Sequence, residues 1–247
     1  MKELTVSAGI CSAPYAAASA KELMDNADLA VYNAKQIGKA QGLVFRGASN
    51  LMPQQLAERT EAIIDRVEEG DSAHKNAIAM ISALTAAIDA KDHYTYAHSK
   101  NIVRYAATLA VASSLNDDQV RTIYISGLLH DIGKISIPEA ILNKESRLSE
   151  EEYQAMKDHV NNSIAIIRCL PEVDYLIPAV LDHHKRWDGK GYPRGIAGKD
   201  IPITARCLVI ADVFDAMTTD RPYRAGMPLE YALGEITRGA GTQFDPE

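Results

Sequence analysis

The segment LLHDIGK at residues 128–134 places three groups of different charge close together. His130 and Asp131 are adjacent, and Lys134 follows four residues after His130. On a helix, residues four apart share a face, so the imidazole and the ammonium group would point the same way, with the carboxylate beside them. The preceding residues 123–129 are mostly apolar, and burying these groups beneath them would be costly without neutralisation. The sequence therefore predicts that a divalent metal ion coordinates this group.

Further histidines and a second carboxylate, at positions expected to be helical, extend this set. The carboxylate is Asp212 within the apolar run RCLVIADVFDAM, where an unpaired charge would be expensive to bury without a cation. His183 and His184 are adjacent, and neighbouring imidazoles favour neutral, metal-bound forms. One histidine on an apolar face is usually a core residue, but that interpretation weakens as the number grows. The candidate metal ligands are His98, His130, Asp131, His159, His183, His184 and Asp212.

This set is too large for one tetrahedral zinc ion and suits two ions that share a carboxylate. Our hypothesis is that Asp131 bridges the two ions. One ion would take His98, His130 and Asp212, and the other would take His159, His183 and His184. Imidazole and carboxylate ligands without thiolate fit iron, manganese, zinc or nickel and argue against magnesium. We interpret the remaining histidines, His74 and His93, as surface residues.

Composition limits the possible classes of protein. The 247 residues can form a substantial core, and the net charge of -7 argues against a general surface for nucleic acids or anionic membranes. No apolar run approaches the roughly 20 residues of a membrane span, and no signal-peptide pattern opens the chain. The three cysteines, Cys11, Cys169 and Cys207, have no paired spacing. This usage predicts a reducing compartment, which we take to be the cytoplasm.

Residues 1–46 are expected to form a small α/β segment. Residues 4–10 alternate as a strand does, Ser19 and Glu22 can cap a helix that stops at Gly38, and residues 43–45 form a second short strand. This segment is too small to fold alone, so we interpret it as the tail of a larger α/β domain.

Residues 47–71 are expected to form a helical linker. Its helix begins near Pro53 and ends near Glu69. The positions that alternate in steps of four and three are Leu56, Thr60, Ile63 and Val67. This repeat is too short to establish a coiled coil, and an amphipathic linker helix is the favoured interpretation. The same helix could pair two copies of the chain as a homodimer.

Residues 72–247 are predicted to be helical throughout, because no segment after residue 50 alternates as a strand does. Asn116 can cap one helix, and Ser149 with Glu152 forms a capping box for another. The helices are expected near residues 72–88, 96–112, 117–130, 153–170, 173–184, 204–217 and 229–237.

Three separated segments resemble the HD-GYP family, the metal-dependent cyclic dinucleotide phosphodiesterases of the HD hydrolase superfamily. These segments are HDIGK at residue 130, HHKRWDGKGYP at residue 183 and IADVFDAMTTDRPYR at residue 210. The resemblance covers about residues 85–247 and implies an all-helical HD-domain bundle. The functional residues it implies are His98, His130, Asp131, Lys134, His159, His183, His184 and Asp212.

The N-terminal segments VSAGI and ADLAVYNAKQIGK resemble the C-terminal end of GGDEF (diguanylate cyclase) domains. The part that names that family, with its metal-binding and nucleotide-binding residues, is not in this sequence. We therefore expect residues 1–46 to be a docking remnant of a GGDEF-like domain without cyclase activity. GGDEF-domain proteins are accordingly candidate partners.

The sequence departs from the HD-GYP pattern at three positions. Tyr94 stands where some members carry a glutamate that supports a third metal, so we expect two metals. Lys185 stands where the family most often has glutamate, and this reversal could alter the following loop or metal affinity. Ser163 replaces a common glycine, which we regard as a minor change.

The expected reaction is in-line attack on a phosphodiester by a hydroxide that bridges the two metals. Asp131 and Lys134 are the predicted catalytic residues, and Lys134 would also hold a phosphate oxygen. The glycine-rich loop at residues 185–202 is expected to cover the site, with Trp187 in packing. Asp215 is expected to orient its neighbours. The predicted substrate contacts are Lys134, Tyr192, Arg221 and Arg224.

The favoured function is hydrolysis of cyclic di-GMP to pGpG, with GMP as a further product, using two ions of iron or manganese, or else zinc or nickel. One alternative is a non-catalytic module that binds a cyclic dinucleotide or a partner protein. The other alternative keeps the enzyme and changes the substrate, for example to 3′,3′-cGAMP. No nucleic-acid polymer is expected as a partner.

Overall fold

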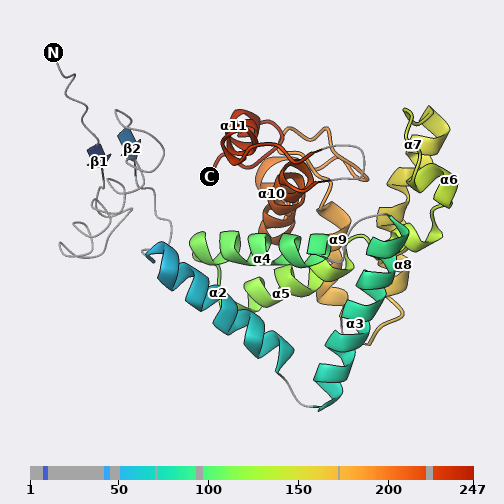
Figure 1. The fold of residues 1–247 in the computed structure, drawn as a ribbon, viewed down its shortest axis with the longest axis horizontal. Helices are drawn as coiled ribbons and strands as arrows, with labels where there is room; N and C mark the ends of the chain where they lie inside the picture. The colour runs from blue at the N-terminus through green and yellow to red at the C-terminus, as the bar shows by residue number, and fades with distance from the viewer. Residues whose placement is uncertain are drawn as a thin grey trace. The chain divides into compact units, whose positions relative to one another are not determined.

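The structure is a computed structural model that describes residues 8–10, 42–44, 51–69, 72–92, 97–171, 173–220 and 225–247 (Figure 1). The chain divides into two compact units, residues 1–59 with 111–115 and residues 60–110 with 116–247. All the predicted metal ligands lie in the second unit.

Two short strands are described near the N-terminus. β1 (Ala8–Ile10) pairs in parallel with β2 (Gly42–Val44), with Gly9 opposite Leu43. They overlap the strands expected at residues 4–10 and 43–45. The helix expected between them lies outside the described residues.

The second unit is a helical bundle, as predicted. Its α-helices are α2 (Pro53–Glu68), α3 (Ser72–Lys91), α4 (Ala97–Ala112), α5 (Asp117–Leu129), α6 (Glu139–Leu142), α7 (Glu150–Lys157), α8 (His159–Ile167), α9 (Ile177–Asp182), α10 (Ile203–Thr218) and α11 (Leu229–Gly239). Three short 3₁₀ helices connect them, namely η1 (Ile132–Ser136), η2 (Asp174–Leu176) and η3 (Gly198–Asp200). The first residues of α2 belong to the other unit.

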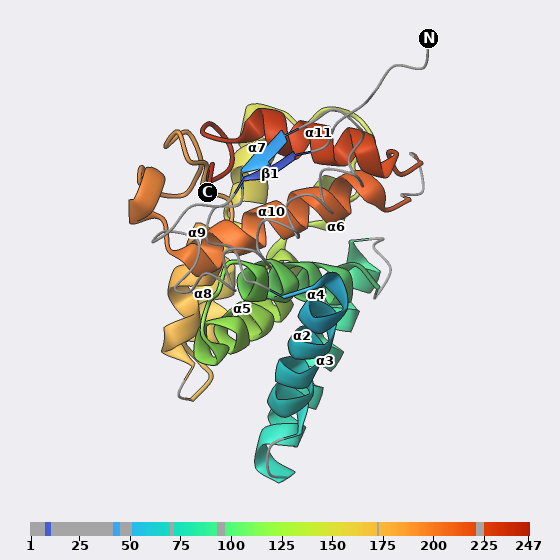
Figure 2. The same cartoon turned by 90° about the vertical axis from the view of Figure 1, so that its left-hand side faces the viewer.

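Helix α5 forms the centre of this unit. It packs against α3, α9 and α10, and α11 lies on the far side of α10 (Figures 1 and 2). Val120, Ile123 and Leu129 of α5 are fully buried. The predicted cap is present, because the Asn116 side chain accepts a hydrogen bond from the Gln119 amide. Because Leu129, the last residue of α5, is fully buried, the HDIGK segment that follows it begins inside the core.

Several expected helices are interrupted in the structure. The helix expected at residues 153–170 is two helices, α7 and α8, which meet at Asp158. The helix expected at residues 173–184 is η2 followed by α9, which ends at Asp182. The ends of α7 and α9 lie just before the predicted ligands His159 and His183, so these ligands sit at helix ends and not in helix interiors.

Hydrogen bonds hold the 3₁₀ helix η1 in place on two sides. The Lys91 ammonium donates to the carbonyl oxygens of Ile135 and Ile137 at 2.7 and 2.8 Å. On the other side, the Ser163 hydroxyl accepts from the Gly133 amide at 2.8 Å and donates to the His130 carbonyl at 2.9 Å. Ser163 therefore has a structural role that the sequence comparison with the family did not suggest.

The C-terminal part of α2 is buried in the single chain. Thr60, Ile63 and Val67 are 2%, 2% and 4% exposed. These are three of the four positions of the short repeat, so their apolar surface is already covered without a second copy. Pairing of two chains through this helix stays a prediction. No helix in the described part of the chain combines the length and the apolar character that crossing a bilayer requires.

Gly133 provides a test of the packing between η1 and α8. A Cβ at this position would overlap the His159 carbonyl oxygen and the Ser163 amide nitrogen. We expect Gly133→Ala to lower the free energy of unfolding by about 3 kcal/mol, measured by urea denaturation, because backbone must move to admit the methyl group. Gly195→Ala is the matched control, since a Cβ there meets no atom within 4 Å. Equal stability of the two variants would contradict this view of the packing.

Candidate functional site

Asp131, His159, His183 and His184 form a compact group in which one possible ligand atom from each residue lies within 4.8 Å of the others. The His159 Nε2 atom lies 3.2 Å from Asp131 Oδ1 and 3.4 Å from His183 Nε2. His130 contacts the second oxygen of the same carboxylate, with its Nε2 atom 3.3 Å from Asp131 Oδ2. Segments far apart in the sequence thus meet at one carboxylate.

Backbone carbonyls at helix ends fix three of these imidazoles. The Nδ1 atoms of His130, His159 and His183 lie 2.7, 2.7 and 2.6 Å from the carbonyl oxygens of the residues three positions earlier. Such carbonyls belong to the last turn of a helix, which leaves them without intrahelical partners. If each Nδ1–H donates to its carbonyl, each Nε2 keeps its lone pair and faces Asp131. That arrangement is typical of histidines that bind metals.

His98 is oriented by a carboxylate. Its Nδ1 atom lies 2.5 Å from Asp215 Oδ2, and the Asp215 side chain is fully buried. The expectation that Asp215 orients its neighbours is thus consistent with its contact. Both Asp212 and Asp215 lie in α10, and we expected Asp212 to be the buried carboxylate of this helix. That expectation was wrong, because Asp212 is partly exposed and Asp215 is the buried one.

The donor atoms of the group suit a cation. Two ligands about 2.0–2.1 Å from one ion at tetrahedral angles lie roughly 3.3–3.4 Å apart. The contacts of His159 Nε2 with Asp131 and His183, at 3.2 and 3.4 Å, match that separation. The buried His130 Nε2 and Asp131 Oδ1 atoms have no hydrogen-bond partner. Lone pairs facing one another without a partner are costly to bury, and a metal ion would satisfy them.

The pKa values of the histidines also favour a bound cation. Burial lowers the pKa of His183 well below its usual value and that of His184 to about 3, with the neighbouring imidazoles adding to the effect. Both rings are therefore neutral at physiological pH. Burial also lowers the pKa of His130, but the Asp131 charge outweighs it and raises the pKa to about 9. A positive charge is therefore favoured beside Asp131, where a proton and a metal ion would compete.

Lys134 is held between two carboxylates. Its Nζ atom lies 2.9 Å from Asp131 Oδ2 and 2.6 Å from Asp92 Oδ2. Burial lowers the pKa of Lys134, but the two carboxylates outweigh it and raise the pKa, so the ammonium stays charged. Sequence reasoning missed Asp92, because it lies 42 residues before Lys134 and no local pattern joins the two.

The loop at residues 185–202 folds back over one edge of the group. The Tyr192 ring stacks on the His184 ring, with centroids 4.7 Å apart. Gly191 permits this, because a Cβ there would overlap the His184 carbonyl oxygen. Arg194 pairs with the buried Asp182 carboxylate at the end of α9. The loop is therefore tied to the same helix end that carries His183 and His184.

The C-terminal residues hold the first part of this loop. The amides of Trp187 and Asp188 donate to the carbonyls of Gln243 and Thr242 at 3.1 and 2.8 Å. Trp187 also lies beneath the Arg206 guanidinium, as expected for a packing residue. Lys185 is 1% exposed and lines a separate cavity of about 10 Å³ together with Trp187. The departure at Lys185 therefore affects the packing beneath the loop.

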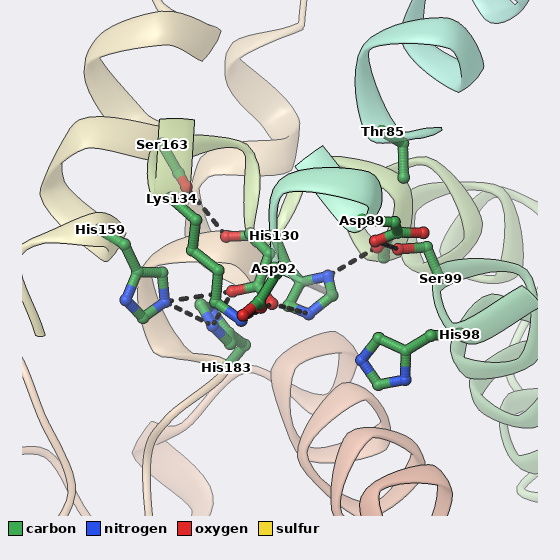
Figure 3. A network of polar contacts seen from close by, with 12 residues as sticks. Thr85, Asp89, Asp92, His98, Ser99, His130, Lys134, His159, Ser163 and His183 are labelled. Carbon is green, nitrogen blue, oxygen red and sulfur yellow. Dashed lines mark hydrogen bonds and ion pairs between the residues drawn. The ribbon is translucent and has the colours of Figure 1, made fainter. Parts of the chain in front are cut away.

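The structure leaves part of the predicted site untested. The predicted first-ion ligands His98, His130 and Asp212 are not members of the four-residue group found among the described residues. The His98 ring points from α4 toward the side of the site that His130 occupies (Figure 3). Arg221 and Arg224, as well as Tyr94 and His93, lie outside the described residues, as does the side chain of His74. Their roles stay predictions.

Comparison with known proteins identifies the fold. Residues 82–247 match the family model described as the HD domain. A crystal structure of a cyclic GMP-AMP specific phosphodiesterase of Vibrio cholerae aligns with a TM-score of 0.54 at 20% identity, covering 68% of this chain and 45% of that chain. At this identity the likeness supports the fold alone.

Curated relatives are similar over the same region. The cyclic di-GMP phosphodiesterase PA4108 of Pseudomonas aeruginosa is 36% identical over 186 residues, which is 75% of this chain and 44% of the relative. The 3′3′-cGAMP-specific phosphodiesterase 3 of Vibrio cholerae is 36% identical over 168 residues, which is 68% of this chain and 36% of the relative. The chain thus spans less than half the length of these two relatives.

The group around Asp131 predicts that metal ions stabilise the protein. After treatment with EDTA, adding Mn²⁺ at about 100 times its Kd should raise the Tm by roughly 5–10 °C, because binding to the folded state adds about 2.7 kcal/mol. The variants His159→Ala and His183→Ala should lose most of this shift in differential scanning fluorimetry. His74→Ala is the control. An equal shift in all the variants would show that the ion binds elsewhere.

Proposed function

This chain belongs to the HD domain family, and we propose that it is an HD-GYP phosphodiesterase that hydrolyses cyclic di-GMP to the linear dinucleotide pGpG, with GMP as a further product. The observation that carries this proposal is the buried group in which three neighbouring histidines surround one carboxylate, Asp131. The HHKRWDGKGYP segment and the names of the curated relatives support the same substrate class.

A phosphodiester resists attack because an anion must approach an anion. Two divalent cations, iron or manganese in our proposal, would when bound neutralise the phosphate and generate hydroxide near neutral pH. Asp131 has the geometry to hold both, because its Oδ1 faces His159 at 3.2 Å and its Oδ2 faces His130 at 3.3 Å. A carboxylate whose two oxygens face different sets of histidines is suited to bridging.

The first of the two ions would be held by His98, His130 and Asp212. His98 is oriented by Asp215 through Nδ1, and a carboxylate partner at the second ring nitrogen is typical of histidines that bind metals. The Asp212 charge is one cause of the raised pKa of His130, so the two residues interact electrostatically. These contacts support a binuclear site with Asp131 between the two halves.

Lys134 would bind a non-bridging phosphate oxygen. Its ammonium is fixed and charged by Asp92 and Asp131, so it needs no rearrangement when the substrate's charge develops. Tyr192 would contact the substrate from the loop, where its ring is anchored on His184. Arg221 and Arg224 would supply forked donors for phosphate or for the edge of a guanine base.

A second candidate substrate is 3′,3′-cGAMP, because one of the relatives is named as specific for it. Metal chemistry at the phosphate would be the same, so a panel of cyclic dinucleotides decides between the substrates. A cytoplasmic location and partnership with GGDEF-domain proteins complete the proposal. They are supported by the cysteine pattern and by the resemblance of residues 1–46 to a GGDEF domain.

The proposed activity can be tested on protein purified without oxygen and loaded with Mn²⁺ or Fe²⁺. Cyclic di-GMP should be converted to pGpG in product chromatography. Lys134→Ala should lower kcat by about 10²–10³-fold with unchanged metal content, because a preorganised charge at the phosphate is lost. Lys75→Ala, at an exposed position of α3, is the control. Tight binding without hydrolysis and without metal would favour the non-catalytic module instead.

Elemental analysis tests the two-ion arrangement separately from turnover. The wild type should contain two ions per chain, and Asp131→Ala should lose both because it would bridge them. His98→Ala should lose one ion, and His184→Ala should lose the other. A wild type that saturates at one ion per chain would overturn the binuclear proposal.

A further inference from the structure

A pocket of about 230 Å³ lies beside the metal-binding group. It is lined by Gln154, Lys157, Asp158, Asn161, Tyr192 and Pro193. Two features connect it to the site. Asp158 directly precedes His159, and the Tyr192 ring that lines the pocket also stacks on His184. The pocket thus lies along α7, the helix break at Asp158 and the start of α8, next to a residue of the metal-binding group.

The size of the pocket suits part of a ligand. Sites for whole small molecules usually measure about 300–1,000 Å³, so this pocket is too small for a complete cyclic dinucleotide. A single base is planar and would fit such a space while its phosphate lies at the metals. Tyr192 offers an aromatic wall, and unstacked bases are commonly held against aromatic side chains.

The polar lining favours guanine over adenine. Asp158 carries a carboxylate that accepts from the Gln154 side chain at 3.4 Å. Lys157 carries an ammonium group, whose Nζ atom lies 4.8 Å from the centroid of the Tyr153 ring. Guanine presents N1–H and N2–H₂ donors that match a carboxylate, and O6 and N7 acceptors that match an ammonium group. Adenine has no N2 amino group, and at the position of O6 it presents a donor that opposes a lysine.

We propose that this pocket is a guanine-specific base subsite in which Asp158 determines specificity. The inference rests on the proposed function, because it assumes that the ligand is a cyclic dinucleotide. The subsite adds residues that distinguish one base from another, whereas the metal-binding group would contact only the phosphate. The subsite predicts a preference for ligands that contain guanine. Among cyclic di-GMP, 3′,3′-cGAMP and cyclic di-AMP, cyclic di-AMP should bind most weakly.

The test measures binding apart from turnover. Phosphorothioate analogues of cyclic di-GMP and cyclic di-AMP, which resist hydrolysis, are titrated into Mn²⁺-loaded protein by calorimetry. The wild type should prefer the guanine analogue, and Asp158→Asn should reduce that preference about tenfold through loss of a bidentate acceptor. Asp158 makes no side-chain capping hydrogen bond to α8, so the variant should fold. The matched control is Asp174→Asn, at an exposed position in η2.

Hydrolysis of the natural dinucleotides is measured in parallel. If the guanine preference falls in Asp158→Asn but no protein hydrolyses either dinucleotide, the subsite stands and the proposed activity fails. If the wild type hydrolyses cyclic di-GMP while Asp158→Asn keeps the full preference, the subsite is overturned. Failure of the wild type to bind either analogue, or equal loss of preference in Asp174→Asn, also overturns it.

Discussion

The constraint on which this structure depends is the burial of lone pairs around one carboxylate. His159 and His183 present Nε2 atoms to each other at 3.4 Å, and Asp131 Oδ1 is buried without a hydrogen-bond partner. In an apolar core such atoms are unfavourable unless a proton or a cation satisfies them. The raised pKa of His130 has the same origin, because the Asp131 charge favours a positive partner despite burial. The fold therefore holds in place a set of donors that is stable when a cation is bound.

Helix ends explain how the fold creates this set. α5, α7 and α9 each end beside a histidine, and the last turn of each helix leaves carbonyl oxygens without intrahelical partners. The Nδ1 atom of the following histidine lies within hydrogen-bond distance of one of these carbonyls. This contact provides the carbonyl with a partner and also orients the imidazole ring. Had these histidines stood in helix interiors, the carbonyls would have been occupied within the helix. The interruptions that distinguish the structure from the expected longer helices are thus what positions the donors.

The sequence predicted the class of fold better than it predicted the contacts around the candidate site. Apolar periodicity and the caps at Asn116 and Ser149 indicated an all-helical bundle, and both caps are present. The break at Asp158 was missed, because no glycine or proline marks it. Asp92 was also missed, since its partner Lys134 is distant in sequence. Between the two carboxylates of α10, apolar neighbours on both sides could not show which one is buried, because that depends on the helices packed against it.

In the proposed arrangement, hydrolysis and base recognition occupy different parts of this fold. The metal donors lie at helix ends anchored by backbone carbonyls, so substitutions of exposed side chains nearby leave their geometry in place. The pocket beside them is lined by side chains of α7, α8 and the loop that carries Tyr192. In the proposed subsite, exposed side chains there would change which base is accepted while the atoms that would act on the phosphate keep their positions. Asp158 stands at the boundary, one residue before a metal-binding histidine, and its side chain lines the pocket while its neighbour faces the core. A fold of this kind can therefore acquire a new substrate preference by changing a surface residue and can keep the same hydrolytic centre.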